Sequence, residues 1–238
     1  MENIDEIATD VFRLSTYNDR SGLAFNHFLV RDQEPLLYHT GQKAIFPEVL
    51  SLAKKLIDPA ALRWIGFSHF EADECGALNA WLAAAPLATP LAGLVLAATC
   101  INDFADRPPR VLQDDEVFST GRHQFRFLST PHVPHGWGAS LLFDETEHTL
   151  FCSDLLVQHG KTAPMSDSVV ERATHDLEEG EKGPFHHAIP YTRDTHATFE
   201  RLAALEPRAL AIMHGASFAG DGAGALREFD RALARVVG

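Results

Sequence analysis

Four side chains that can bind a metal lie close together in the segment SHFEADEC. His69, Glu71, Asp73 and Glu74 fall within six consecutive positions. The segment follows the apolar run LRWIGF and precedes the apolar, Ala-rich GALNAWLAAA. Imidazole nitrogens and carboxylate oxygens are common ligands of transition metals. The residue types and their spacing therefore make this segment a candidate for metal chemistry.

Three further segments carry ligand-type side chains at the end of an apolar stretch. His132 and His135 lie in PHVPHGWG, Asp154 lies in FCSDLL, and His214 lies in IMHGAS. Taken singly, a His in such a loop is more often a hydrogen-bonded residue, and an Asp after a strand often caps a turn or helix. Four polar clusters at four strand ends are harder to explain by folding, because buried imidazoles and carboxylates cost stability unless they are paired or coordinated. A metal site shared by all four segments is the economical interpretation.

A series of strands and helices must bring these segments together. In the first part of the chain we expect strands at residues 10–17, 24–32, 35–41 and 63–69 and helices at 46–57 and 76–84. In the second part we expect a strand at 91–98, hairpins at 114–131 and 139–154, helices at 192–207 and 224–237, and a strand at 209–215. The irregular acidic stretch at 166–185 is either a partly helical lid or a surface excursion. Two rounds of strands followed by helices predict an α/β fold, a four-layer αββα sandwich. The ligand-type residues begin where strands end, which is where α/β folds usually present their chemistry.

Length and composition predict one globular domain over residues 1–238. The 45% of hydrophobic residues and 22% of charged residues are ordinary for a protein with a sizeable core. The longest apolar stretches are interrupted by prolines and glycine, so we expect no membrane span and no membrane partner. The N-terminal MENIDEIATD has neither the basic nor the apolar region of a signal peptide. We therefore expect a cytoplasmic protein.

Charge and cysteine content exclude other classes of protein. The formal net charge of −13 argues against a nucleic-acid partner, because binding the phosphate backbone relies on clustered Lys and Arg. Cys75, Cys100 and Cys152 show no CxxC spacing and cannot all pair. This argues against a disulfide framework and against a zinc ribbon, so we expect reduced thiols.

The order of the four segments resembles the metallo-β-lactamase superfamily, and within it the flavodiiron and oxygen-binding diiron branch. The pattern is H-x-E-x-D starting at His69, a His after a TP turn, an Asp after a strand at Asp154, and His-Gly at His214. It covers nearly the whole chain, including NHFLV and YHTG near the start and SDLLVQHG in the middle. The resemblance implies the αββα fold and a cofactor of two iron ions.

Position 71 distinguishes this branch from the hydrolases of the superfamily. Those hydrolases typically carry H-x-H-x-D-H and bind zinc, whereas Glu71 stands where the second His would be. Carboxylates are harder ligands than imidazoles, and an anionic bridge between two cations stabilises ferric ions. Glu71 therefore favours iron, and zinc is the alternative metal.

Carried over by motif, the resemblance implies two ligand sets that share one carboxylate. The residues expected to bind the first iron are His69, Glu71, His135 and Asp154. The residues expected to bind the second iron are Asp73, Asp154 and His214. Asp154 would bridge the two ions.

Three positions leave alternatives open. His132 competes with His135, because the spacing from TP to His is one residue longer than usual; His135 is preferred because GWGAS leads into the next strand. Glu74 stands where the family motif has His, so it is either a ligand or a neighbour that supports the ligands. His159, five residues after Asp154, either hydrogen-bonds a ligand, lines the pocket or lies at the surface.

The resemblance implies a non-haem diiron protein that binds dioxygen, and that reduces dioxygen or nitric oxide when electrons are supplied. The chain ends at Gly238, directly after the last expected helix, so we expect none of the flavodoxin domain that flavodiiron enzymes add. The implied partner is a separate electron donor, such as a flavoprotein or a rubredoxin-like protein. Dimers are common in the similar family, so a homodimer is a candidate assembly.

Two other functions compete with this one. The first is a dinuclear metal-dependent hydrolase of the same superfamily, in which two metal ions lower the pKa of a bridging water. Glu71 argues against it. The second is a protein that binds a ligand or partner without metal, which Glu74 allows but the six intact ligand positions disfavour.

Overall fold

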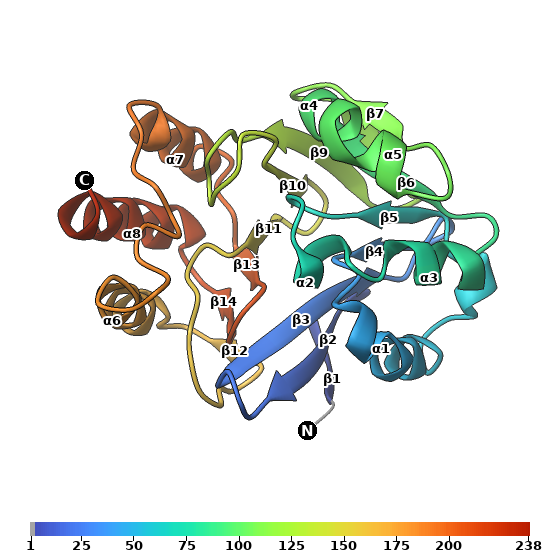
Figure 1. Cartoon of the computed structure of the whole chain (residues 1–238), viewed down its shortest axis with the longest axis horizontal. Coiled ribbons are helices and arrows are strands. Elements are labelled where there is room, and N and C mark those ends of the chain that lie inside the picture. Colours follow the sequence, from blue (N-terminus) through green and yellow to red (C-terminus); the bar gives the residue numbers. More distant parts are fainter. Residues whose placement is uncertain (1–2) are drawn as a thin grey trace.

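Two seven-stranded sheets pack between two layers of helices in the computed structural model, which describes residues 3–238 (Figure 1). The first sheet contains, in spatial order, β1 (Asn3–Ala8), β2 (Val11–Asn18), β3 (Leu23–Val30), β4 (Leu36–Tyr38), β5 (Trp64–Gly66), β6 (Thr89–Gly93) and β7 (Arg110–Leu112). The second sheet contains, in spatial order, β12 (Met165–Ser166), β14 (Ser217–Ala219), β13 (Ala209–Ile212), β11 (Thr149–Ser153), β10 (Ser140–Asp144), β9 (Gln124–Ser129) and β8 (Val117–Ser119). The predicted four-layer αββα sandwich is confirmed.

The helices form two groups on opposite sides of the molecule (Figure 1). The first group contains α1 (Phe46–Ala53), α2 (Ala72–Cys75), α3 (Leu78–Ala84), α4 (Leu94–Leu96) and α5 (Asn102–Phe104), with 3-10 turns at Lys43–Ile45 and Pro59–Ala61 and a π-helix at Ala97–Ile101. The second group contains α6 (Val170–Gly180), α7 (Thr195–Ala203) and α8 (Gly222–Val236). Within residues 3–238, none of these helices is long and apolar enough to cross a membrane.

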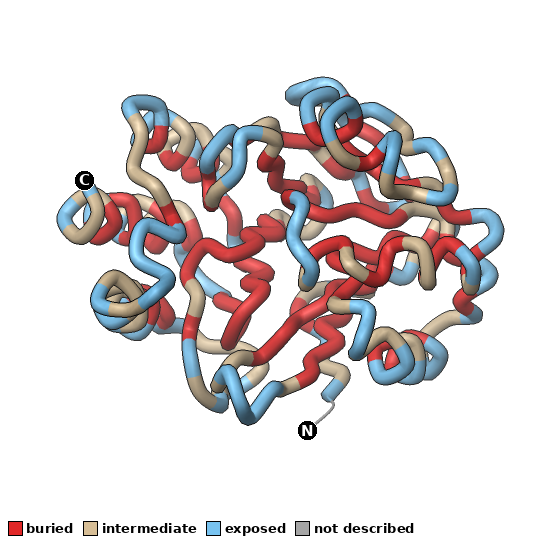
Figure 2. Tube along the Cα trace, in the orientation of Figure 1, coloured by how far each residue is buried: buried red, intermediate tan, exposed pale blue. Residues whose placement is uncertain are grey.

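Strand alternation divides the core into three layers of buried side chains. In β3, Phe28 and Val30 pack between the sheets, whereas Leu29 between them in sequence packs under α1 and α3. Successive side chains of a strand point to opposite faces, so a strand covered on both faces can bury apolar residues at consecutive positions, as β3 does at its end. Figure 2 shows the result, with buried strands at the centre and exposed positions on the outer helices. That residues 1–238 form a single domain stays a prediction.

The segment predicted as a strand at 91–98 is only partly a strand. The strand β6 ends at Gly93, and the chain continues as α4 and the π-helix. Leu94 and Val95 are exposed while Leu96 and Ala97 are buried, which is a one-sided helical pattern. A short apolar run fits a buried strand and a helix equally well, which is why the prediction was wrong here.

The acidic stretch at 166–185 is largely the helix α6. Val170 and Ala173 of this helix are buried in the cluster that α7 and α8 also form. The acidic residues therefore occupy the outer face of a helix that covers the second sheet.

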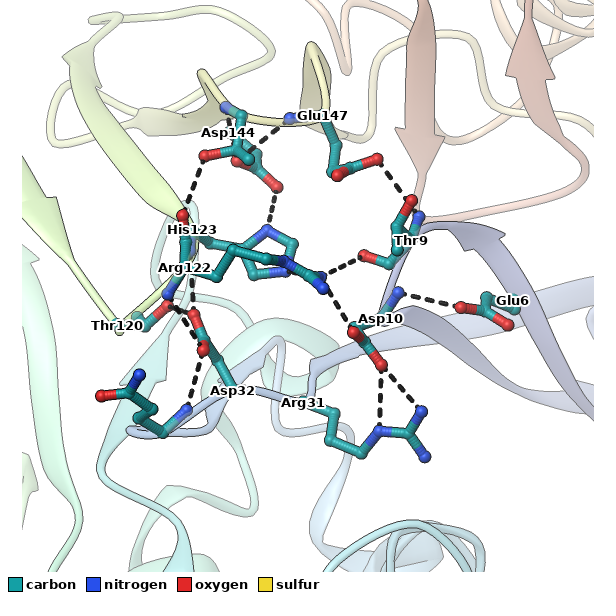
Figure 3. A network of polar contacts seen from close by, with 12 residues as sticks. Glu6, Thr9, Asp10, Arg31, Asp32, Thr120, Arg122, His123, Asp144 and Glu147 are labelled. Atoms are coloured by element: carbon teal, nitrogen blue, oxygen red, sulfur yellow. Dashed lines mark hydrogen bonds and ion pairs between the residues drawn. The ribbon is translucent and has the colours of Figure 1, made fainter.

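A group of polar residues, here called the inter-sheet clasp, joins the two sheets (Figure 3). It consists of Asp10, Arg31, Asp32, Arg122 and His123. The Asp32 carboxylate accepts hydrogen bonds from the backbone amides of Arg122 (3.1 Å) and His123 (2.9 Å). Asp10 forms ion pairs with Arg31 (2.7 Å) and Arg122 (2.9 Å). The clasp lies at the start of β9, so it holds the sheets together at the end of that strand away from His135.

Candidate metal centre

The ligand-type residues come together where four strands end. His69 follows β5 and leads into α2, which carries Asp73 and Glu74. The other three segments follow β9, β11 and β13 in the second sheet. After β13, Gly215 has φ of 116°, and a Cβ at that position would lie 2.6 Å from Gln158 Cβ. Only glycine fits this turn, which explains the His-Gly pair at His214.

One half of the cluster is built around two histidines. The Nε2 atoms of His69 and His135 lie 2.8 Å apart. Asp154 Oδ2 lies 3.4 Å from each of these nitrogens. Glu71 Oε1 lies 3.2 Å from His135 Nε2 and 3.9 Å from His69 Nε2. Two imidazole nitrogens and two carboxylates therefore converge on one point.

The other half of the cluster is built around His214. Its Nε2 atom lies 3.4 Å from Asp73 Oδ2 and 3.2 Å from Asp154 Oδ1. The two oxygens of Asp154 thus face different halves of the cluster. A carboxylate in this position can bridge two cations.

Glu74 is the most buried member of the cluster. Its side chain has no exposed surface, and within residues 3–238 neither carboxylate oxygen has a hydrogen-bond partner. Burial raises the pKa of Glu74 well above its ordinary value, and the charges of Asp154 and Asp73 raise it further. Glu74 therefore lies inside the cluster. The sequence left open whether this residue is a ligand or a neighbour that supports the ligands, and its position is compatible with either role.

The charges of the cluster shift pKa values in opposite directions. Burial opposes the charged imidazole of His214, but contacts with Asp154 and Asp73 outweigh it and raise the pKa to about 10. The pKa of Asp154 is lowered far below its ordinary value, against its burial, because His214, His69 and His135 all face it. A proton on His214 supplies positive charge where a metal ion would otherwise supply it.

These residues fit two metal ions. Three groups of ligand atoms lie within 4.8 Å of one another: His69 with His135 and Asp154, His69 with Glu71 and Glu74, and Asp73 with Glu74 and His214. Within the described residues, both oxygens of Glu74 are buried without a hydrogen-bond partner. Buried polar atoms in native proteins are nearly always satisfied, so unpaired oxygens facing a common centre indicate a cation there.

Contacts outside the cluster orient the ligand rings. Ser68 Oγ lies 2.9 Å from His69 Nδ1, 3.1 Å from His39 Nε2 and 2.6 Å from Ser153 Oγ. When His69 Nδ1–H donates to Ser68, the Nε2 lone pair points into the cluster. Our sequence analysis missed both serines. The available signal was that each directly precedes a ligand-type residue, in Ser68-His69 and Ser153-Asp154.

The backbone fixes the ring of His214 in the same way. Its Nδ1 atom donates to the carbonyl oxygen of Ala24 in β3, at 2.8 Å. A first-sheet strand therefore orients a second-sheet ligand, and Nε2 is left facing Asp73 and Asp154.

Three residues considered from the sequence lie outside the ligand groups found among residues 3–238. His132 is exposed, whereas the preferred alternative His135 faces His69. His159 is half exposed and lies 3.9 Å from Asp176. The thiol of Cys75 donates to the carbonyl oxygen of Glu71, and burial raises its pKa to about 12. It is a packed thiol.

Comparison with known proteins identifies a matching family and several relatives. The family model described as ODP family beta lactamase matches residues 23–215. The rubredoxin-oxygen oxidoreductase of Megalodesulfovibrio gigas is 25% identical over 206 residues, which cover 84% of this chain and 50% of that protein. The anaerobic nitric oxide reductase flavorubredoxin of Salmonella paratyphi B is 26% identical over 152 residues, 62% of this chain and 31% of that protein.

The solved structures agree on the fold. The rubredoxin oxygen:oxidoreductase from Desulfovibrio gigas matches with a TM-score of 0.84 at 20% identity, over 96% of this chain and 61% of that one. The chain spans a quarter to a half of the length of the curated relatives it matches.

Proposed function

Because the chain belongs to the ODP beta-lactamase family, we propose that it is a non-haem diiron protein that binds dioxygen and, with electrons from a separate donor, reduces dioxygen or nitric oxide. The observation that carries the proposal is the position of Asp154, whose two oxygens face different halves of the cluster at 3.4 Å and 3.2 Å. The names of the relatives, an oxygen oxidoreductase and a nitric oxide reductase, support the choice of substrates.

Six residues would hold the two ions in this proposal. The set for the first ion is His69, Glu71, His135 and Asp154. The set for the second ion is Asp73, Asp154 and His214. A pair of ferrous ions would supply two electrons in total, which is enough to reduce one dioxygen to peroxide, or two nitric oxide molecules to nitrous oxide and water when two protons are taken up.

The protein selects the metal and controls access to it. Glu71 offers a hard oxygen ligand where the zinc hydrolases have an imidazole, which favours iron. Its side chain is 53% exposed and that of His135 is 20% exposed, whereas Glu74 on the inner side has no exposed surface. The cluster therefore opens to solvent at Glu71, and a small diatomic molecule needs no deeper pocket.

The electron donor in this proposal is a separate flavoprotein or rubredoxin-like protein. The names of the relatives, which refer to rubredoxin and to flavorubredoxin, support this class of partner. The 238 residues contain no G-x-G-x-x-G fingerprint for a nicotinamide cofactor.

Oxygen uptake by the chemically reduced, iron-loaded protein tests the proposal. We expect rapid consumption of roughly one dioxygen per iron pair, and no sustained uptake when NADH or NADPH is the only reductant. Addition of a reduced flavoprotein should restore uptake. Sustained uptake with the nicotinamide alone, or no reaction of the reduced protein, would contradict the proposal. Hydrolytic activity with bound zinc would instead support the dinuclear hydrolase.

A further inference from the structure

We propose that Glu74 is a seventh metal ligand and, with Asp154, a second carboxylate that binds both metal ions. The proposal rests on the proposed dinuclear centre and departs from the family motif, which has His at this position, because one imidazole nitrogen binds one ion whereas a carboxylate can bridge two. It begins from the unpaired carboxylate of Glu74, whose two oxygens are buried without a partner among residues 3–238.

The backbone holds Glu74 in place. Its carbonyl oxygen accepts hydrogen bonds from the backbone amide of Thr40 at 2.7 Å and from the Thr40 hydroxyl at 3.1 Å. Thr40 follows β4 in the first sheet, so α2 is fixed against that sheet at this residue. From this fixed backbone the side chain projects into the cluster, where it has no exposed surface.

The carboxylate of Glu74 reaches both halves of the cluster. Glu74 Oε2 lies 3.6 Å from His69 Nε2, in the first half. Glu74 also has ligand atoms within 4.8 Å of those of Asp73 and His214, in the second half. Asp154 is the only other residue of the ligand groups within residues 3–238 that has ligand atoms facing both His69 and His214.

The charges agree with a bridging role. Within the described residues, the ion pair of Glu74 is with His69, and no Lys or Arg lies within ion-pair distance. Glu71, Asp73, Glu74 and Asp154 together carry four negative charges when ionised. Two divalent ions carry four positive charges. The metal pair thus balances the carboxylates that the fold places here, and without it the ionised, buried Glu74 would face only the imidazole of His69, at 3.6 Å.

The alternative is a protonated Glu74 that only fills space. A protonated Glu74 would donate a hydrogen bond to Asp73, a contact that helps to raise its pKa, and would need no metal ion. If Glu74 only fills space, a glutamine of the same shape at this position should leave metal affinity unchanged. If Glu74 is a ligand, the glutamine should lower metal affinity, because a neutral amide binds metal poorly and cannot bridge two cations.

Metal titration distinguishes a metal-binding Glu74 from a protonated Glu74 that fills space. Metal-free protein is titrated with Fe²⁺ under anaerobic conditions, and separately with Zn²⁺. The variant is Glu74→Gln. The control is Asp230→Asn, which removes a buried carboxylate hydrogen-bonded to Tyr191 on the far helix α8. We expect wild type and control to bind two ions, and Glu74→Gln to bind at least one of them about tenfold or more weakly.

Two ions bound by Glu74→Gln with wild-type affinity would overturn the inference and leave the diiron proposal intact. Zinc bound in place of iron by the wild type would overturn the diiron proposal, while the zinc titration would still test Glu74. A wild type that binds neither metal would overturn both. If Glu74→Gln fails to fold, a crystal structure of metal-loaded wild type decides: we expect a Glu74 oxygen at about 2.0–2.2 Å from each ion, and contact with neither would refute the bridge.

Discussion

Asp154 Oδ1 lies 3.2 Å from Nε2 of His214, while its Oδ2 faces the histidines of the other half of the cluster. A residue shared between two ions and a residue that contacts one ion should differ in their effect on metal content. We expect Asp154→Ala to weaken the binding of both ions and His214→Ala to leave one ion bound tightly. The measurement is the number of Fe²⁺ ions bound per chain. Equal loss in the two variants would contradict a shared carboxylate.

The identity of residue 71 should control which metal is bound. Glu71→His exchanges an oxygen ligand for a nitrogen ligand at 3.2 Å from His135. We expect the variant to hold more zinc and less iron when cells grow with both metals, because imidazole suits zinc better than it suits ferric iron. Glu48→His, an exposed position in α1, is the matched control. If the iron content and the oxygen response of Glu71→His equal those of the wild type, residue 71 is not the cause of the selectivity.

The hydroxyl of Ser68 should support metal binding without touching the metal. Ser68→Ala removes the partner of His69 Nδ1 at 2.9 Å and frees the ring to change orientation and tautomer. We expect iron affinity to fall about 10- to 100-fold, the usual effect of losing a residue that orients a ligand. Ser51→Ala, at an exposed site in α1, should leave the affinity unchanged. Unchanged affinity in Ser68→Ala, measured by the same titration, would show that the hydroxyl does not orient His69.

The inter-sheet clasp should make stability depend on pH. Burial alone would raise the pKa of Asp32, but hydrogen bonds from the backbone amides of His123 and Arg122 outweigh it, so the folded pKa lies below the ordinary 3.8. A lowered folded pKa contributes stability that is present above the unfolded pKa and is lost as the pH falls through the folded pKa. We expect Asp32→Ala to cost about 2 kcal/mol near neutral pH, and less as the pH falls below about 4.

Denaturant unfolding of the wild type and Asp32→Ala at a series of pH values measures this. Asp19→Ala, an exposed carboxylate in the turn before β3, is the control and should change little at any pH. A difference between wild type and Asp32→Ala that stays constant from neutral to acid pH would show that the charge of Asp32 does not contribute through the clasp.

Much of the fold could be predicted because its strands are apolar on both faces and end in polar segments. The positions of His69, Asp154 and His214 follow from this pattern, since each comes within three residues of the end of a strand. The contact of Ser68 with His39 could not be predicted, because it joins residues 29 positions apart and depends on the left-handed backbone of His39, whose φ is 68°. Sequence spacing carries no information about such a contact.

Other features that the sequence did not predict also depend on local backbone turns or on contacts between distant segments. The choice between His132 and His135 depends on how one loop turns: His132 has φ of 65° and is exposed, while His135 faces His69. The helical segment after Gly93 was indistinguishable from a strand by composition. The clasp joins side chains from distant turns, and its residues look like ordinary surface charges in the sequence.

The proposed diiron centre is tested by quantifying iron and zinc in protein purified without added metal from cells grown with both metals, with all steps kept anaerobic. We expect about two irons per chain and little zinc, because Glu71 and the shared Asp154 favour iron. Stoichiometric zinc, or protein that contains neither metal and binds none when it is supplied, would contradict it.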